Sequence, residues 1–474
     1  MFCTCEQYKD TEEYDSATRP ATKKKRSHDE GKSSRQQSPA GSPCFALTMG
    51  TYPPEWDPQA SVWLSWPSSG PLCSLLPSSN TVIADMAAAL AKCVPYVSML
   101  VNGPKDIAAV EQAMKARDVG MEKIKCIVVP HSDEWIRDFG PIFLKVDGRL
   151  SVASFGWNYW GCIEHYMDIS TEEDCEEASV ISRRCADELG LPVVQSSLVS
   201  EGGNREFNGA GVLMATASVE KQRNPGLSLE AIEMELKRIF CVQKVIWLEE
   251  GVADDDHIWL GPRRYDGKDM LEFNAACTGG HIDEYCKFVG PKTILLAEVP
   301  HFERNTLLGA LTHSRMERNL AILSSSHGTD TNGERFDIIR IPTPPTMKLP
   351  IRREDTFWSW LETIRFENNG HPIMGKDLLV SHSEIQVVLP ASYVNMIICN
   401  KTILLPKYGC SSTETRWSYL SEEVNAFALE TDEMARSVLA THFPDYNIVQ
   451  IPSVAALNLG GGGMHCTSQQ QPIE

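Results

Sequence analysis

The sequence predicts an α/β fold, and three observations lead to that prediction. From Tyr52 onward, short runs rich in β-branched residues alternate with stretches of amphipathic helical pattern, an order typical of α/β architectures. Hydrophobic residues make up 42% of the chain and charged residues 23%, as expected for a water-soluble globular protein. The 474 residues are enough to bury a large core, although length alone allows one to three domains.

The predicted elements follow this alternation along the chain. A helix is expected over residues 82–94, a strand over 96–101, a second helix over 108–116 and a strand over 125–129. Later strand-like runs lie at 245–248, 293–297, 338–341, 384–389, 396–405 and 446–451. Two polar stretches without a helical pattern, 252–278 and 343–380, are expected to be inserted loops.

The first 48 residues differ in composition from the rest. They are polar and poor in aliphatic residues, so we expect a disordered tail that cannot bury enough apolar surface to offset the entropy of ordering. The Lys-Lys-Lys-Arg run at 23–26 resembles a nuclear import signal, but a solvated tail is the preferred interpretation. Residues 49–474 are expected to form a single domain.

Net charge and cysteine content restrict the classes of function that this protein can have. The formal net charge of −19 disfavours nucleic acid and anionic membranes as partners and favours a cationic small molecule or peptide. The 15 cysteines are an odd number in a long chain without a secretory signal pattern, which predicts reduced thiols in the cytoplasm. No apolar run reaches the roughly 18 residues of a membrane span. Neither a CxxC pair nor an HExxH helix is present, so the strong metal and redox spacings are absent.

Four segments place reactive residues beside glycines, and the first two precede residue 210. Residues 133–141 contain Trp135 and Asp138 ahead of a Gly-Pro turn, directly after a predicted strand. A turn cap with a surface ion pair is the alternative interpretation. Glu201 precedes two glycines, which let the backbone approach a ligand closely, although Gly-Gly turns are common in proteins.

The third and fourth segments supply a histidine and a thiol. His281 and Asp283 are two positions apart, so they share one face of an extended segment; a surface turn is the alternative. Gly460 to Gly463 stand shortly before Cys466. Four glycines cost backbone entropy, which makes sense if the chain passes tightly beside a ligand and holds the thiol there. The alternative is a flexible terminal segment.

This residue set suits a cationic electrophile. Several carboxylates beside a thiol oppose the oxyanion that forms when an ordinary amide is attacked, whereas a guanidinium is always charged and pairs bidentately with carboxylates. Such chemistry needs no metal or organic cofactor. Two rivals belong to other classes. One is a metallohydrolase with ligands His281, Asp283, Glu201 and Cys466, an unusual zinc set; the other is a catalytically silent module that binds arginine-rich tails.

The motifs resemble one family in number and order. From Tyr52 to the end, the chain is similar to agmatine deiminases and bacterial-type peptidylarginine deiminases, members of the guanidino-group-modifying (pentein) superfamily. The matching motifs are Pro54-Glu55-Trp56, 63–67 (WLSWP), 135–141 (WIRDFGP), 158–161 (NYWG), 201–204 (EGGN), 280–284 (GHIDE), 389–395 (LPASYVN) and 461–466 (GGGMHC). The resemblance implies a five-bladed pseudo-symmetric α/β propeller, in which different blades each bring a motif to the central axis.

The resemblance also implies roles for the site residues. Cys466 would be the nucleophile, and His281 the acid that protonates departing ammonia and then the base that activates water. Asp138 and Asp283 would clamp the guanidinium. Glu201 would hold one guanidinium nitrogen and steady His281. His465 is expected to be structural, because His281 already fills the acid/base role.

The sequence predicts the type of reaction more clearly than it predicts the substrate. We expect agmatine, with peptidyl arginine as the alternative, because a strongly acidic chain favours a dication. Trp135 and Arg205 are further substrate-binding candidates. Arg205 would receive a substrate carboxylate, although a solvated loop residue is its preferred interpretation. A homo-oligomer is compatible with the sequence. The long segments at 252–278 and 343–380, and the Met396-Ile397 pair after Asn395, depart from the family pattern.

Overall fold

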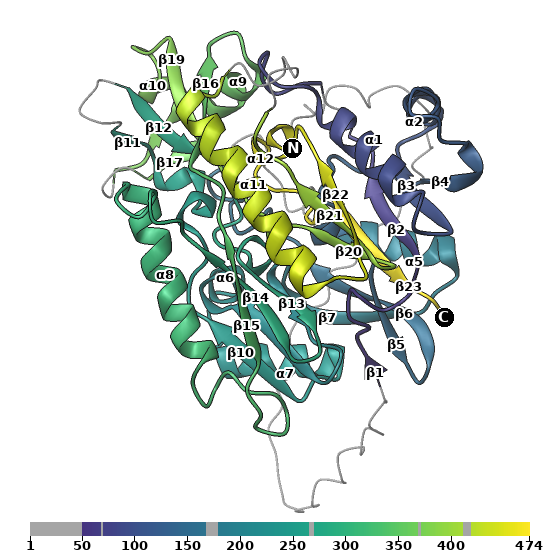
Figure 1. Ribbon diagram of the computed structural model, residues 1–474. Coiled ribbons are helices and arrows are strands. Elements are labelled where there is room, and N and C mark those ends of the chain that lie inside the picture. Colours follow the sequence, from purple (N-terminus) through teal and green to yellow (C-terminus); the bar gives the residue numbers. More distant parts are fainter. Residues whose placement is uncertain (1–49, 68–69, 167–178, 265–269, 368–370, 411–418) are drawn as a thin grey trace, which may run out of the picture.

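The computed structural model describes residues 50–67, 70–166, 179–264, 270–367, 371–410 and 419–474, and it has a mixed α/β fold (Figure 1). The predicted tail, residues 1–48, lies outside the described residues. Five sheets share one pattern: two antiparallel strands, the second of which pairs in parallel with a third strand. Because a parallel connection must cross over the sheet, a helix usually lies between the second and third strands.

One of the five sheets joins the two ends of the described chain. Strand β2 (Gln59–Ser65) is antiparallel to β23 (Ser468–Pro472) and parallel to β3 (Tyr96–Val101), which pairs in parallel with β4 (Ile124–Val128). Figure 1 shows the last strand, in yellow, beside the second, in purple. Helices α1 (Ser79–Leu90) and α2 (Pro104–Lys115) make the crossovers.

The other four sheets repeat the pattern in chain order. Their strands are β5 (Ile142–Val146), β6 (Arg149–Gly156) and β7 (Val193–Val199), with β1 (Gly50–Thr51) added beside β5; β8 (Glu206–Phe207), β9 (Val212–Thr216) and β10 (Lys244–Leu248); β13 (Cys286–Gly290), β14 (Thr293–Glu298) and β15 (Asp337–Pro342); and β20 (Ile397–Cys399), β21 (Thr402–Pro406) and β22 (Asn447–Ile451). The repeat is therefore one of topology and is not visible in the sequence.

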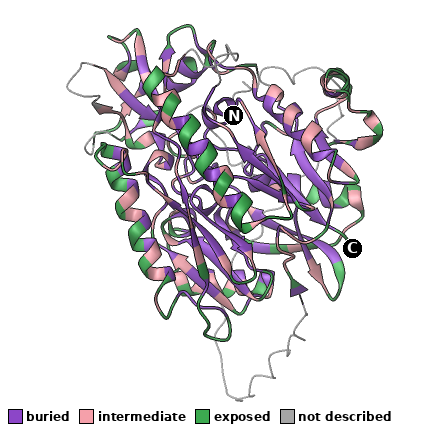
Figure 2. Ribbon diagram, in the orientation of Figure 1, coloured by how far each residue is buried: buried purple, intermediate pink, exposed green. Residues whose placement is uncertain are grey.

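Helices of these four sheets cover the strands from outside. They are α5 (Ile181–Leu189), α6 (Ala217–Arg223), α7 (Leu229–Phe240), α8 (Leu307–Leu323) and α11 (Glu422–His442). Figure 2 shows α8 and α11 with a solvent-exposed outer face, whereas the strands beneath them are mostly buried. Most buried apolar residues form a single cluster, and a smaller one lies under α7. No helix in the described ranges combines the length and apolarity that a membrane crossing requires.

The two predicted insertions contain regular structure, so the expectation of plain loops is wrong. Residues 252–278 contribute β11 (Arg263–Arg264) and β12 (Leu271–Asn274), and residues 343–380 contribute β16 (Met347–Arg352) and helix α9 (Thr356–Leu361). Both insertions join one sheet, because β19 (Glu384–Leu389) pairs with β12 and with β16. Helix α9 buries Phe357, Trp358 and Trp360, but six residues are too few to show a helical period.

The remaining elements are short, and most predicted strands are confirmed. Strands 96–101 and 384–389 have the expected bounds, while 396–405 is a hairpin whose turn residues Asn400 and Lys401 have positive φ. Helix 82–94 begins and ends about three residues earlier than expected. The short elements are α3 (Ile136–Phe139), β17 (Arg365–Phe366), β18 (Ile373–Met374), α10 (Gly375–Leu378), α12 (Ala455–Asn458) and the 3₁₀ turns Met121–Lys123, Gly202–Asn204, Ala253–Asp255, Ile258–Leu260 and Ile282–Glu284.

Candidate active site

Each of the five repeated sheets is preceded by a loop that ends just before its first strand, and these loops carry the predicted site residues. Asp138 lies ahead of β5 and Glu201 ahead of β8. His281 and Asp283 precede β13, and Cys466 precedes β23. The loop before β20 carries Asn395, which the sequence interpretation did not assign to the site. Five equivalent loops thus supply the candidate site.

The Cys466 thiol is buried among polar groups. Asn395 Nδ2 donates a hydrogen bond to Cys466 Sγ over 3.1 Å, and Sγ lies 3.7 Å from Asp283 Oδ2 and 3.6 Å from Glu284 Oε1. Burial, followed by the charges of Asp283 and Glu284, raises the pKa of the Cys466 thiol well above its usual value. The thiol is therefore protonated at neutral pH until a cation approaches it.

The glycine run ahead of Cys466 is packed tightly, so the flexible-segment alternative is wrong. Gly461 has φ of +103°, and a Cβ there would lie 1.8 Å from the carbonyl oxygen of Ala276. At Gly462, a Cβ would lie 2.7 Å from the Trp135 ring and 3.1 Å from Cys466 Sγ. Glycine is required here because neighbouring backbone and an aromatic ring occupy the space of any side chain.

Asp283 connects the thiol to a buried charge network. His465 Nδ1 lies 2.7 Å from Asp283 Oδ2, and His465 Nε2 lies 2.9 Å from Lys287 Nζ. An ammonium can only donate, so His465 Nε2 accepts and its Nδ1 donates to Asp283. Lys287 also pairs with Glu55 (2.6 Å) and Glu206 (3.2 Å). Although burial opposes ionisation, the bond from His465 lowers the pKa of Asp283.

His281 lies within a second set of buried charges. His281 Nε2 is 3.3 Å from Glu201 Oε2, and Glu201 Oε1 accepts from Arg223 Nε over 2.8 Å. Burial opposes the charge on Glu201, but Arg223 and His281 outweigh it and hold the pKa at about 2. For His281 burial also opposes the charge, yet Asp138, Glu201 and Asp283 raise its pKa to about 9. His281 is accordingly an imidazolium at neutral pH.

The segment that carries His281 is a turn and not the expected extended strand. Ile282–Glu284 form a 3₁₀ helix that His281 caps, and Gly279 and Gly280 before it have positive φ. The carboxylate of Asp255 holds this turn, because it accepts from the backbone amides of Thr278, Gly280 and His281. Because these amides donate to Asp255, they are not available for a strand ladder.

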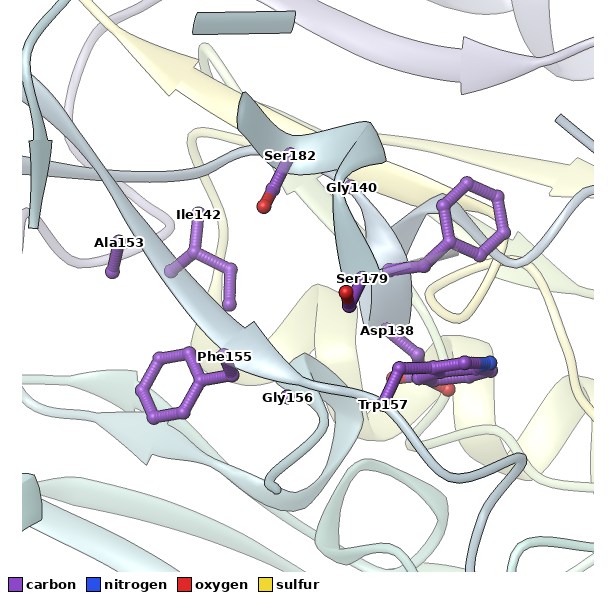
Figure 3. Close-up of a pocket in the computed structure, with 10 residues that line it drawn as sticks. Asp138, Gly140, Ile142, Ala153, Phe155, Gly156, Trp157, Ser179 and Ser182 are labelled. Carbon is purple, nitrogen blue, oxygen red and sulfur yellow. The ribbon is translucent and has the colours of Figure 1, made fainter. Parts of the chain in front are cut away.

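Asp138 is held from two sides within the one-turn helix α3. Its Oδ1 accepts from the Gly203 amide over 2.9 Å, and its Oδ2 accepts from Trp160 Nε1 over 2.8 Å. Trp160 and its neighbour Tyr159 both have positive φ, an uncommon backbone state for such residues. Figure 3 shows Asp138 and Trp157 at the edge of a small pocket that Ser179 and Ser182 also line.

Gly203 lies where His281, Asp138 and Asp283 converge. A Cβ on this glycine would lie 2.5 Å from His281 Nδ1, 3.1 Å from Asp138 Oδ1 and 3.2 Å from Asp283 Oδ2. Within the described part of the chain, His281 Nδ1 and Asp283 Oδ1 are buried without a hydrogen-bond partner. Buried polar atoms normally have partners, so Asp283 Oδ1, which can only accept, is suited to a ligand that carries N–H groups, whereas Nδ1 of protonated His281 can only donate.

Arg205 does not lie on the surface, where the preferred sequence interpretation put it. It is buried, donates to the Ser200 hydroxyl and stacks on the ring of Phe155 at 4.3 Å, so the prediction of a solvated loop residue is wrong. It borders a small cavity together with Arg137, Tyr52 and the His465 ring. No described contact joins Arg205 to Cys466 or Asp138. Trp135, in contrast, lies directly against the glycine run beside the thiol.

The proposed zinc set is not brought together as one group. Among the described residues, the cluster close enough for a cation contains Asp283, Glu284 and Cys466, with one atom of each within 4.8 Å of the others. His281 and Glu201 are not part of it. Two carboxylates and a thiol without an imidazole are not a usual zinc set, and we assign them no metal.

Several residues of the site were missed by sequence reasoning. Glu284 and Asn395 stand within quoted motifs, so their spacing before β13 and β20 was an available signal. Trp160 was part of another motif. Arg223 and Asp255 lie in ordinary-looking helical and acidic stretches, and nothing local distinguishes them, because their partners are more than twenty positions away.

Comparison with known proteins defines the class first. The model of the Porphyromonas-type peptidyl-arginine deiminase family matches residues 51–472. The match covers most of the chain. The chain therefore belongs to the Porphyromonas-type peptidyl-arginine deiminase family.

Individual relatives within this class are named agmatine deiminases. The chain is 28% identical to that of Medicago truncatula, with 89% of this chain and 96% of the relative covered. It is 27% identical to that of Pseudomonas putida, with 89% and 95% covered. Among solved structures, the agmatine deiminase of Enterococcus faecalis superposes with a TM-score of 0.65 at 21% identity, covering 90% of this chain and 98% of that one. That structural likeness shows the fold alone.

Proposed function

We propose that this chain is a cysteine-dependent deiminase that hydrolyses the guanidinium group of agmatine to a ureido group, releasing ammonia. Family membership makes the chain a deiminase, a hydrolase of C–N bonds. The substrate is supported by relatives named agmatine deiminase that align over nearly their whole length. A solved C. jejuni agmatine deiminase variant with substrate bound, TM-score 0.60 at 19% identity, shares the fold.

The observation that carries the proposal is that Asp138, Asp283 and His281 converge beside Gly203. All three lie around one point, and Asp283 Oδ1 lacks a hydrogen-bond partner among the described residues. A planar guanidinium with five N–H donors fits two carboxylates arranged in this way. Two acidic groups around one point select a cation and repel the carboxylate of free arginine.

The proposed reaction has two halves. Cys466 Sγ attacks the central guanidinium carbon, and the C–N bond breaks as the departing nitrogen takes a proton from the His281 imidazolium. Water then attacks the thiouronium, and one of its protons passes to neutral His281. The C–S bond breaks with its electron pair going to sulfur, and the remaining hydroxyl proton is released as the ureido C=O bond forms. The raised pKa of His281, about 9, suits the first half, because the proton donor is already charged.

Glu201 acts on His281 in this proposal. Its carboxylate lies 3.3 Å from His281 Nε2 and fixes the ring so that Nδ1 faces Asp138. Arg223 in turn holds Glu201. Buried ion pairs of this kind keep a catalytic ring in one orientation, and their residues are positioned before the substrate arrives.

We infer that the five repeated sheets are the blades of a five-bladed α/β propeller. Two features support this arrangement: the shared strand order of the five sheets, and the pairing of β23 with β2, which joins the end of the chain to its beginning. Loops before equivalent strands would then meet near one axis. The cytoplasmic location and a homo-oligomer stay predictions from the sequence.

The substrate is tested by comparing kcat/KM for agmatine with that for a short peptide ending in arginine, with ammonia release as the assay. We expect a preference for agmatine of about tenfold or more, because no lysine or arginine among the described residues pairs with Asp138 or Asp283, and the one cation beside them, His281, already faces carboxylates. Arg205→Ala is the matched variant. A tenfold preference for the peptide that is lost in Arg205→Ala would contradict the proposal.

A further inference from the structure

The Cys466 thiol must lose a proton before it can attack carbon, and one neighbour is placed to accept it. Cys466 Sγ contacts two carboxylates, at 3.7 Å for Asp283 Oδ2 and 3.6 Å for Glu284 Oε1. His281 is bonded through Nε2 to Glu201 instead. We propose that Glu284 is a further catalytic residue, which takes the proton of Cys466 as the guanidinium binds. This inference rests on the proposed deiminase function.

The two carboxylates differ in what else they bind. Asp283 Oδ2 accepts a 2.7 Å hydrogen bond from His465 Nδ1, and that ring contacts Lys287, so Asp283 is tied to a positively charged network. Glu284 has no cationic side chain within 4.0 Å among the described residues. The carboxylate without a cationic partner is the stronger base, because its charge is not already compensated.

Asn395 fixes the geometry of the thiol and Glu284. Its Nδ2 donates to Glu284 Oε1 over 2.9 Å and to Cys466 Sγ over 3.1 Å. Glu284 is only 2% exposed, and its backbone carbonyl accepts from Ser392 Oγ, so the residue is held from both sides. One amide thus holds the proton donor and the proton acceptor 3.6 Å apart.

The charges around Glu284 bring its basicity closer to that of a thiol. The titratable groups that face it are Asp283, Asp255, Asp254, Tyr408, Cys277 and Cys466. Burial, followed by the nearby aspartates, raises the pKa of Glu284 well above its usual value. A more basic carboxylate is a more effective acceptor for a thiol proton, since the efficiency of a general base increases as its pKa rises toward the operating pH.

The proton transfer is balanced in charge and in atoms. The proton moves from Sγ to Oε1, so the thiol–carboxylate pair carries one negative charge before and after the step. The electron pair left on sulfur forms the bond to the central guanidinium carbon, whose positive charge stabilises the developing thiolate. When the C–S bond breaks after attack by water, the electron pair returns to sulfur and the proton returns from Glu284.

The test is the variant Glu284→Gln, whose amide oxygen still accepts from Asn395 but cannot take a proton. Glu272→Gln is the matched control: Glu272 is also buried, but it pairs with Arg263 and Lys348 in the insertion sheet. Two quantities are measured: kcat for ammonia release, and the pH dependence of inactivation by iodoacetamide without substrate. Thermal unfolding checks that both variants fold.

The proposal predicts opposite changes in the two quantities. In Glu284→Gln, kcat falls by about 10²–10⁴-fold, the contribution of a general base. The midpoint of alkylation moves at least ~1 pH unit lower, because a like charge beside the thiol has been removed. A kcat within threefold of the wild type, or slower alkylation together with a lower kcat, would overturn the proposal. If the wild type releases ammonia from no guanidine, the proposed function fails instead, and the alkylation midpoint still reports on Glu284.

Discussion

At the scale of residues, the site contains four buried carboxylates whose negative charges are balanced by cations to different degrees. Glu201 is neutralised by Arg223, and Asp283 is bonded to His465. Asp138 lies 3.9 Å from His281, whereas Glu284 has no cationic side chain within 4.0 Å among the described residues. Burial, and then the charges of nearby carboxylates only partly offset by His281, raise the pKa of Asp138. Because part of this negative charge is not balanced by the protein, a bound cation stabilises the site. A guanidine hydrolase requires this property.

Two variants are expected to distinguish the loss of proton transfer, seen in kcat, from the loss of substrate binding, seen in KM. His281→Gln should lower kcat by about 10²–10⁴-fold while changing KM little, because it removes the proton donor. Asp138→Asn should also raise KM, because the guanidinium loses one carboxylate. Steady-state kinetics on agmatine separate the two effects. Identical defects in both variants would mean that the roles are misassigned.

The pH dependence follows from the raised pKa of His281. Ammonia loss requires the imidazolium, so kcat should fall as pH rises through about 9, the pKa of His281 in the folded protein. Since this pKa lies above the ordinary value of about 6.5, the stabilising effect of the charge is complete below pH 6.5 and is lost as pH rises through 9. Unfolding temperatures between pH 6.5 and 9 check this, and a stability that increases over that range would contradict the assigned charges.

At the scale of elements, the loop before the first strand of each sheet carries the chemistry, and the glycines in these loops create its space. Gly203 lies within the 3₁₀ turn before β8 with its Cα beside Asp138, Asp283 and His281. Strands and helices behind the loop fix its position, whereas the loop sequence remains free to present side chains.

Gly203→Ala tests this placement. The added methyl would lie 2.5 Å from His281 Nδ1, so we expect kcat/KM to fall by about 10²-fold with little loss of stability, as a displacement of roughly 1 Å in a site produces. Gly70→Ala is the control, because a Cβ there meets nothing within 4 Å. Activity within threefold of the wild type in Gly203→Ala would show that the convergence point is not used.

Elements with a strong pattern were predictable from the sequence, and elements defined by distant partners were not. The run 96–101 is short and strongly apolar, so its bounds were correct. The hairpin at 397–406 was predicted as one strand because Asn400 and Lys401, rather than glycine, form its turn. His281 and Asp283 were expected on a strand, but Asp255 holds them in a turn. The identities of the motif residues predicted the chemistry, while the roles of Arg223 and Asp255 become visible only through contacts with distant parts of the chain.

At the scale of the molecule, the fold supplies every group that the proposed chemistry needs. The five sheets bring loops separated by more than three hundred residues together, from Asp138 to Cys466, and β23 ends beside β2. The nucleophile is a thiol, the acid is an imidazolium and the charge is neutralised by carboxylates, so no step calls for a metal ion.

Activity should therefore be independent of metal. We expect ammonia release to survive dialysis against EDTA and addition of zinc to give no stimulation, because the thiol and imidazole already supply the nucleophile and the acid. Elemental analysis of the same sample measures bound zinc. Loss of activity on chelation that zinc restores would favour the metallohydrolase over the thiol mechanism.

The central claim is that Cys466 forms a covalent bond to the guanidinium carbon. The most direct measurement is intact-protein and peptide mass spectrometry after acid quenching of the wild type during turnover of agmatine. The account predicts a substrate-derived adduct on the peptide that contains Cys466, absent from Cys466→Ala, which should also lose several orders of magnitude in kcat. Turnover in Cys466→Ala above about a tenth of the wild-type rate, or an adduct on a different cysteine, would contradict it.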